Sequence, residues 1–499
     1  MAVLPSLLLG VIAAVAAEPT LLVQPYVQPG PQGTLGATDE VKVIWIAEPT
    51  TATFTLEYAP KGLPPAAAKI ARTEFEFTPP PAKALTPAEK PQQYVRFVAS
   101  LPGLTPNAEY TYVLRSGGKV FAERTARARK TPDQPTRLLL VGDLADGKTG
   151  QNTIAYRIAQ EKPDALVALG DIVYPSGRSF HYFKHYWPTY VNVAAASEKT
   201  GAPLMATIPF YAVLGNHDAL VGKLSPTLPD AFAAYYFFTA PQNGPGEGAW
   251  TTQLPKSEEG AKFRRLAGAT YPALDFYSFD YGPAHLVVLS NASTGKGDDP
   301  KVAAWVEQDL KASRQPWKIV CLHAPPFQVT TSHYGDQRSR KLAPIFEAQG
   351  VDVVFAGHVH NYQRSKPFKF SPHGTIVAAK PEDPKEAAKA EPSGAPKIPP
   401  SYVNGAFTID DVYDATGQTR PKGVIYIVAG GGGAKLYTGT VDKNLAKLPN
   451  GGKDNYAPFN AKLYDTQHSF AVLDLTAKRF ELRAVNAKGE EIDRFAIEK

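Results

Sequence analysis

The sequence is poor in cysteine. Cys321 is the only one among 499 residues, so an intramolecular disulfide is excluded. A chain without a disulfide framework must be stabilised by hydrophobic burial, and this length is sufficient for two or more domain cores. Cys321 lies in the apolar run KIVCLH. We therefore expect it to be a small, buried residue within a strand.

A strong excess of charge is also missing. The 53 Lys and Arg residues and 47 Asp and Glu residues leave a formal net charge of +6 at pH 7. Because no basic stripe with interleaved aromatic residues occurs, we do not expect nucleic acid as a partner. The mild positive balance is compatible with an anionic substrate. Nothing in the composition predicts an oligomeric state.

Long hydrophobic runs are absent except at the N-terminus, where residues 3–17 are predominantly apolar. Small residues before Glu18 suit signal-peptidase cleavage, which predicts a signal peptide over residues 1–18. An uncleaved anchor or a lipid-facing tail is the alternative, because no Lys or Arg precedes the run. No later segment predicts an integral membrane span. We therefore expect a secreted or periplasmic protein.

Residues 20–130 are expected to form a small all-β sandwich. Short runs with partial alternation of apolar and polar residues, such as VKVIWIA and TFTLEYA, are separated by Pro and Gly clusters. The segment LPGLTPNAEYTYVLRSGG resembles a passage of fibronectin type III domains. This resemblance implies that Tyr110 and Tyr112 are the core and corner aromatic residues.

Residues 135–499 are expected to form an α/β domain. Runs such as RLLLVGD, DALVALGD and VDVVFAGHVH are almost continuously apolar, which is typical of strands buried on both faces. Two helices are predicted between them, in QNTIAYRIAQ and in PKVAAWVEQDLKAS. The second would place Trp305, Val306 and Leu310 on one face. The C-terminal segment predicts closing β-hairpins.

Two further segments have unusual compositions. Residues 374–400 are rich in Pro, Lys and Ala without an apolar face, which predicts an exposed insertion at about residues 370–420. The segment GGGGAK at residues 430–435 lacks the spacing of a phosphate-binding P-loop. We expect its glycines to let a strand end pack closely against neighbouring loops.

Polar residues stand at the ends of five apolar runs, where ligand sites of open α/β sheets occur. The runs end in Asp143 of VGDLAD, Asp171 and Tyr174 of GDIVY, Asn216 and His217 of LGNHD, His323 of CLHAPP, and His358 and His360 of AGHVH. Each piece alone could be a turn, a helix cap or a structural histidine. Their occurrence in order, on what we expect to be one sheet, favours a common site.

The donors in this set are oxygen and nitrogen atoms, with no sulfur. Such donors suit iron, zinc or manganese rather than a structural thiolate site. A carboxylate among them could bridge two metal ions, as in enzymes with two-metal sites. The sequence therefore predicts a metal centre.

These motifs resemble those of the purple acid phosphatases, in the binuclear metallophosphoesterase superfamily. The family's pattern is Gly-Asp-x-Gly, Gly-Asp-x-x-Tyr, Gly-Asn-His-Asp/Glu, Val-x-x-His and Gly-His-x-His. The resemblance extends to FYSFDYGPAHLVVLSNAS, WVEQDL and GEEIDRFAIEK. It implies a four-layer metallophosphoesterase β-sandwich flanked by helices, preceded by the small all-β domain.

The resemblance also implies a binuclear centre of Fe(III) and a divalent Fe, Zn or Mn ion. The ferric ion would be bound by Asp143, Asp171, Tyr174 and His360, and the divalent ion by Asp171, Asn216, His323 and His358. Asp171 would bridge the two, and the Tyr174 phenolate would produce a charge-transfer colour. His217 and His333 would contact the phosphate and protonate the leaving group.

The sequence departs from the family pattern at two positions near the motifs. Ala145 stands where the first motif has Gly, and Gln363 stands where Glu is commoner. The aromatic segment SGRSFHYFKHYWPTY is also open to two interpretations. We favour a packed helix that is formed through its Tyr and Trp residues. In the alternative interpretation, Arg178 or His181 would line the entrance to the substrate site.

The sequence therefore predicts an exported phosphoesterase that hydrolyses small phosphate monoesters, with a metal-bound hydroxide as nucleophile. A phosphodiesterase or nucleotide hydrolase of the same fold is the first alternative. The second is a protein of another class, a non-catalytic binding or adhesion protein that uses its β-sandwich.

Overall fold

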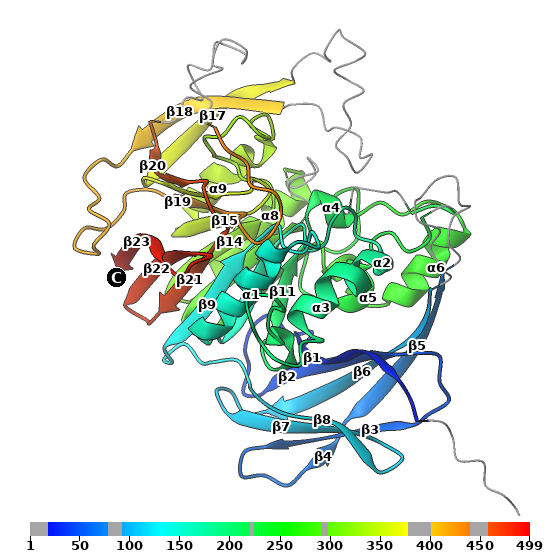
Figure 1. Cartoon of the computed structure of the whole chain (residues 1–499). Coiled ribbons are helices and arrows are strands. Elements are labelled where there is room, and N and C mark those ends of the chain that lie inside the picture. The colour runs from blue at the N-terminus through cyan, green and yellow to red at the C-terminus, as the bar shows by residue number, and fades with distance from the viewer. Residues whose placement is uncertain are drawn as a thin grey trace, which may run out of the picture.

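A computed structural model describes residues 18–77, 92–219, 224–226, 228–290, 298–377, 401–439 and 458–499 (Figure 1). The predicted signal peptide therefore lies outside the described residues, apart from Glu18. The described chain forms an N-terminal β-sandwich and a larger α/β domain, as the sequence predicts. None of its helices is both long and apolar enough to span a bilayer.

The N-terminal β-sandwich consists of two four-stranded sheets. One has the order β1 (Leu21–Pro29), β2 (Asp39–Ala47), β6 (Gln92–Leu104), β5 (Lys69–Phe77), and the other β4 (Ala66–Ala67), β3 (Phe54–Pro60), β7 (Glu109–Ser116), β8 (Lys119–Arg127). Alternate residues of β7 are buried, as the period of a strand requires. In the core, Trp45 stacks on Phe97 with ring centroids 5.3 Å apart.

One detail of this domain differs from the prediction. Strands β5 and β8 agree with it, and their outward positions carry many charged residues. Tyr110 and Tyr112 are both buried. The hydroxyl of Tyr112, however, donates to the carbonyl of Ala206 in the α/β domain at 2.7 Å, so it does not make the expected corner within the sandwich.

The α/β domain contains two larger sheets instead of the single one expected from the motif order. The six-stranded sheet has the order β11 (Phe210–Val213), β10 (Ala165–Leu169), β9 (Thr136–Val141), β21 (Ser469–Leu475), β22 (Arg479–Asn486), β23 (Glu491–Glu498). The seven-stranded sheet has the order β12 (Phe276–Tyr281), β13 (Ala284–Leu289), β14 (Trp317–Leu322), β15 (Val353–Ala356), β19 (Ile425–Ala429), β16 (Tyr362–Ser365), β20 (Asn460–Tyr464). Continuous apolar runs identify buried strands but cannot assign them to one sheet or two.

Helices cover the outer faces of both sheets, which gives the four layers implied by the family resemblance (Figure 1). The longer ones are α1 (Thr149–Glu161), α6 (Glu258–Ala267) and α8 (Pro300–Ala312). The shorter ones are α2 (Ser179–His181), η1 (Tyr182–Tyr186), α3 (Trp187–Tyr190), η2 (Leu204–Ala206), α4 (Asn216–Ala219), α5 (Ala234–Phe237), α7 (Thr270–Ala273), η4 (Arg338–Leu342) and α9 (Ala343–Ala348).

The two predicted helices are present as α1 and α8. Asp299 begins α8 as its N-cap by accepting a hydrogen bond from the Lys301 amide. The buried face of α8 is formed by Val302, Val306 and Leu310. Trp305 was expected on this face but is only partly buried, and its indole N–H donates to the Asn243 carbonyl at 2.9 Å.

The predicted exposed insertion is partly wrong. Strands β17 (Phe368–Val377) and β18 (Ser401–Ile409) pair as an antiparallel two-stranded sheet, and Phe370 and Val403 within them are buried. Residues 378–400, which contain most of the Pro- and Lys-rich composition, lie outside the described residues. The flanks belong to the fold because their apolar side chains pack against Phe327.

The two domains are held together by buried contacts. The Tyr26 hydroxyl donates to the Phe237 carbonyl at 2.8 Å, and the Arg96 guanidinium donates to the Tyr236 carbonyl at 2.5 Å. Side chains of both domains share one hydrophobic core. Because these contacts bury apolar area and satisfy polar groups together, the sandwich forms an integral part of the structure.

A buried histidine links β12, β13 and α8. The two ring nitrogens of His285 lie 2.8 Å from carboxylate oxygens of Asp280 and of Asp309. Burial lowers the pKa of His285, but hydrogen bonds and charge from the two aspartates raise it more strongly, to about 9. His285 is therefore charged at neutral pH and compensates the buried Asp280 carboxylate and the half-buried Asp309 carboxylate.

The His285 cluster predicts that stability falls in alkaline solution. A folded-state pKa above the ordinary value means that the stabilisation is complete below about pH 6.5 and is lost as pH rises through about 9. The shift corresponds to about 3 kcal/mol of unfolding free energy. Urea unfolding between pH 6 and pH 10 should show this loss in wild type and a much smaller one in His285→Gln. The exposed His373→Gln control should retain the wild-type dependence, and an unchanged dependence in His285→Gln would contradict the assignment.

Candidate metal centre

Asp143 and Asp171 begin the site at the carboxyl ends of two adjacent parallel strands. They follow β9 and β10, and the amides of Asp143 and Leu144 donate to the carbonyls of Gly170 and Asp171. Both aspartates are buried and have positive φ angles, of 62° and 49°. Non-glycine residues seldom adopt this conformation, so the fold holds both carboxylates in place at some conformational cost.

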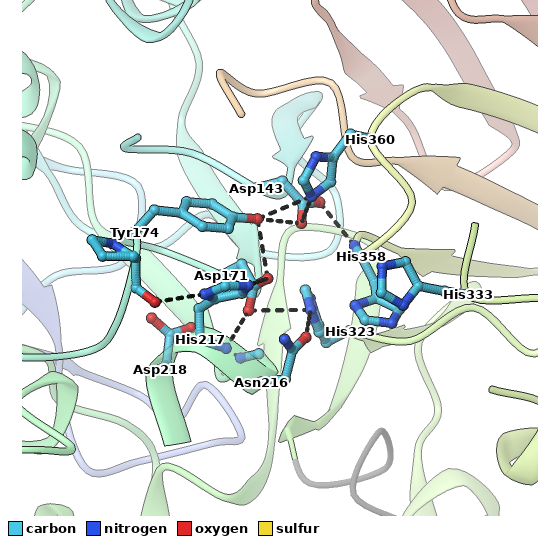
Figure 2. Close-up of polar contacts among 12 residues, drawn as sticks. Asp143, Asp171, Tyr174, Asn216, His217, Asp218, His323, His333, His358 and His360 are labelled. Carbon is cyan, nitrogen blue, oxygen red and sulfur yellow. Dashed lines mark hydrogen bonds and ion pairs between the residues drawn. The ribbon is translucent and has the colours of Figure 1, made fainter. Parts of the chain in front are cut away.

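The remaining predicted residues come from both sheets. Asn216 and His217 follow β11 of the six-stranded sheet and begin α4. His323 follows β14 of the seven-stranded sheet, and the pair His358 and His360 follows β15. The structure thus brings all seven predicted ligands together where the two sheets meet (Figure 2). Their assignment as ligands stays a prediction.

The first group of donors contains Asp143, Asp171 and His360, whose ligand atoms lie within 4.8 Å of one another. The Tyr174 hydroxyl lies among them, 2.9 Å from Asp143 Oδ1, 3.0 Å from Asp171 Oδ2 and 3.1 Å from His360 Nε2. Two carboxylates, a phenol and an imidazole form a hard, anionic donor set. This set fits a highly charged ion such as Fe(III).

The second group contains Asp171, His323 and His358, again within 4.8 Å of one another. Asn216 Oδ1 lies 3.0 Å from His323 Nε2, which in turn lies 3.2 Å from Asp171 Oδ1. One carboxylate, one amide oxygen and two imidazoles suit a divalent ion. Because the two groups share Asp171, whose two oxygens face different groups, the donor set fits a bridged pair of metals.

Backbone carbonyls orient three of the histidines. The Nδ1 atoms of His323 and His360 lie 2.8 Å and 2.7 Å from the carbonyls of Leu169 and Lys435. His217 Nδ1 lies 2.8 Å from the Pro175 carbonyl. A carbonyl can only accept, so these contacts place the N–H on Nδ1 and direct Nε2 toward the site.

The electrostatics of the site depend on these close pairs. Burial raises the pKa of Asp171, but the nearby His323 and His217 lower it more, so its pKa lies well below the usual range. For His323, burial lowers the pKa, whereas Asp171 raises it to about 9. Burial, together with Asp143 and Asp171, raises the pKa of the Tyr174 phenol. Metal binding at these residues would therefore release protons.

His217 stands beside both groups. Its amide donates to Asp171 Oδ1 at 2.8 Å, and its ring lies 4.4 Å from the Tyr174 ring, measured between centroids. Its Nε2 is 3.8 Å from Asp171 Oδ2. It belongs to neither of the two donor groups.

His333 lies on the side of the second group, with its ring centroid 4.0 Å from that of His358. Between them stands Asp336, which the sequence analysis missed. One of its oxygens, Oδ2, is 2.9 Å from His358 Nε2 and 3.4 Å from His333 Nδ1. The only sequence signal is a carboxylate three residues after His333, which is common in turns.

The glycines after β19 pack closely against the metal loops, as predicted. A Cβ atom on Gly430 would lie 2.7 Å from Asp143 Oδ2, and one on Gly432 would lie 2.4 Å from the Gly142 carbonyl. Larger residues would collide with fixed atoms at both positions. The Tyr437 ring, a few residues later, stacks on His360 with centroids 4.0 Å apart.

The aromatic segment after Tyr174 is a packed element, as favoured from the sequence. Tyr182, Tyr186 and Trp187 are buried. Arg178 is buried in an ion pair with Asp230, its Nε 2.8 Å from Oδ1, and His181 Nδ1 lies 2.8 Å from the Ser176 carbonyl. These contacts give both side chains structural roles.

The two departures from the family pattern leave the ligands in place. Ala145 is buried and pairs with Val173 in an isolated bridge. Gln363 accepts a hydrogen bond from the Val329 amide at 2.8 Å and donates to Asn361 at 2.9 Å. A neutral amide thus both donates and accepts at a buried position.

Comparison with known proteins agrees with this geometry. Residues 136–362 match the family model of calcineurin-like phosphoesterases. The chain therefore carries a calcineurin-like metallophosphoesterase domain.

Within that class, the chain is similar to plant purple acid phosphatases. Purple acid phosphatase 21 of Arabidopsis thaliana is 37% identical over 270 residues, which cover 53% of this chain and 52% of the relative. Purple acid phosphatase 18 of the same plant is 27% identical over 268 residues, covering 52% and 51%. The chain thus spans about half the length of the curated relatives it matches.

One solved structure shows that the fold is shared. The purple acid phosphatase PPD1 from yellow lupin (Lupinus luteus) seeds superimposes with a TM-score of 0.61 at 18% sequence identity. The superposition covers 95% of this chain and 74% of the lupin chain.

The shared carboxylate predicts two metal ions per chain. We expect elemental analysis of purified, metal-reconstituted protein to give about two ions in wild type and about one in His358→Ala, because that variant removes a donor of the second group and none of the first. His333→Ala should retain both ions, as should the exposed His373→Ala control. Loss of an ion in His333→Ala would assign His333 to the ligand set instead.

Proposed function

We propose that this protein is a metal-dependent phosphatase of the acid phosphatase type that hydrolyses small phosphate monoesters. The observation that carries the proposal is the pair of buried donor groups that share Asp171. The calcineurin-like domain and the similarity to proteins named purple acid phosphatases support the same class of chemistry.

The proposed cofactor is a binuclear centre of Fe(III) and a divalent Fe, Zn or Mn ion. When bound, such ions polarise a phosphoryl group and lower the pKa of water, which supplies the nucleophile. The chain's own part is to hold the ions on Asp143, Asp171, Tyr174 and His360, and on Asp171, Asn216, His323 and His358.

His217 and His333 are proposed to act on the substrate. His217 keeps one N–H on the Pro175 carbonyl, so a second proton would sit on Nε2, facing the site. His333 lies on the opposite side, against His358. Imidazolium groups there would hydrogen-bond phosphoryl oxygens and give a proton to the departing alkoxide.

Export is part of the proposal and rests on the apolar segment before Glu18. A phosphodiesterase or nucleotide hydrolase would use the same donors and differ at the rim of the site. A binding or adhesion protein would not need a complete donor set. Five of the seven residues form two compact donor groups, and Tyr174 and Asn216 lie within hydrogen-bond distance of them, which favours catalysis over adhesion.

The proposal predicts phosphate release from an aryl monoester by metal-reconstituted protein. We expect wild type to hydrolyse the monoester faster than the matched diester between acid and neutral pH. His323→Ala should lower kcat/KM by about a thousandfold or more. The variant removes a donor to the metal centre, and a bound ion stabilises the charge of the transition state by several kcal/mol. The exposed His373→Ala variant is the control.

Three outcomes of this assay are distinct. Faster hydrolysis of the diester would move the function to the phosphodiesterase alternative. Activity that survives in His323→Ala would place the chemistry elsewhere. Absence of turnover in protein with confirmed metal content would overturn the phosphatase proposal.

Tyr174 gives a second, spectroscopic prediction. A phenolate bound to Fe(III) absorbs visible light by charge transfer, so reconstituted wild type should be coloured. Tyr174→Phe should lose the visible band while keeping at least one ion, because Asp143, Asp171 and His360 remain as donors. A visible band that is unchanged in Tyr174→Phe would show that Tyr174 is not a ligand.

A further inference from the structure

The loop that carries His333 is attached to the β17–β18 hairpin, outside the metal groups. The Ser401 amide donates to the Gly335 carbonyl at 2.7 Å, and the Gln337 amide donates to the Ser401 carbonyl at 3.3 Å. Asp336 thereby forms a parallel bridge with Ser401. The hairpin thus supports the short segment 333–337, which contains both His333 and Asp336.

One side chain joins the hairpin to this loop and to the chain segment that precedes it. Arg340 Nε donates to the Pro326 carbonyl at 2.6 Å, and Nη1 donates to the Val403 carbonyl in β18 at 3.3 Å. The guanidinium also hydrogen-bonds with the Tyr334 side chain, directly after His333. Three chain segments therefore meet at a single planar group.

Aromatic rings hold this guanidinium in place. Its central carbon lies 4.7 Å from the ring centroid of Phe327 and 5.8 Å from that of Phe370 in β17. Arg340 is only 1% exposed. Burial lowers its pKa to about 10, so the group remains charged at neutral pH. A fork of donors that stacks on aromatic faces is a property of Arg that Lys does not share.

We propose that Arg340 is a positioning residue for His333. Its hydrogen bonds to Pro326, Tyr334 and β18 fix the position of the His333 ring against His358. Arg340 itself contacts neither substrate nor metal. The inference rests on the proposed function, because it assigns His333 the protonation of the leaving group. Misplacement of a catalytic group by about 1 Å can cost about a hundredfold in rate.

The test is the dependence of rate on the leaving group in Arg340→Lys. An alkyl phosphate needs a proton on its leaving oxygen, whereas an activated nitrophenyl phosphate scarcely does. We expect kcat for the alkyl ester to fall by about 10- to 100-fold and for the aryl ester by less than about threefold. KM and metal content should stay near wild type, because the ligand groups are untouched.

A double-mutant cycle links the effect to His333. If Arg340 acts through His333, then His333→Ala/Arg340→Lys should be no more than about twofold slower than His333→Ala on the alkyl ester. Arg338→Met, two residues away in the same short helix, serves as the matched control and should behave as wild type. Multiplicative losses in the double variant, or equal losses on both esters, would overturn the proposal.

Two measurements keep the test independent of stability and activity. Tyr334→Phe removes only one hydroxyl, so it should fold and give a smaller loss of kcat with the same preference for the aryl ester.

Amide hydrogen exchange over residues 333–337 and 401–403 should be faster in Arg340→Lys than in wild type or Arg338→Met. Unchanged exchange would overturn the positioning role. If wild type hydrolysed neither ester, the proposed function would fail, and the exchange result would still decide whether Arg340 orders the loop.

Discussion

The structure of the site depends on one buried carboxylate, that of Asp171. Its Oδ1 accepts the His217 amide and faces His323, and its Oδ2 lies 3.0 Å from the Tyr174 hydroxyl. A buried anion is costly unless charges and donors compensate it. The residues around Asp171 are therefore fixed by the need to satisfy it. The two oxygens of Asp171 also separate the donors into two groups, because Oδ2 faces the first group and Oδ1 faces the second.

The second constraint is the meeting of two sheets. The six-stranded sheet supplies the loops after β9, β10 and β11, and the seven-stranded sheet supplies those after β14 and β15. Side chains from facing loops can surround a metal ion, whereas one sheet edge would offer donors from a single side. The glycines after β19 permit this approach because they leave room for the Asp143 loop.

Much of this arrangement could be predicted from the sequence. Buried strands and amphipathic helices have strong local patterns, and the motif residues stand directly after strands. The pairing of strands into two sheets could not be predicted, because apolar runs such as those of β10 and β14 look alike. Asp336 was missed for a related reason, since its partner His358 follows β15, 22 residues further along the chain, and only the fold brings the two together. The β17–β18 flanks were obscured by the adjacent Pro- and Lys-rich residues.

The carbonyls that accept from His217, His323 and His360 belong to the main chain of Pro175, Leu169 and Lys435. Every amino acid carries such a carbonyl, so the tautomer of each imidazole does not depend on which side chain occupies the accepting position. Substitutions at these three positions can therefore alter the surroundings of the site without turning a ring. Proteins of this fold can thus diverge widely in sequence around a donor arrangement that is specified by backbone geometry.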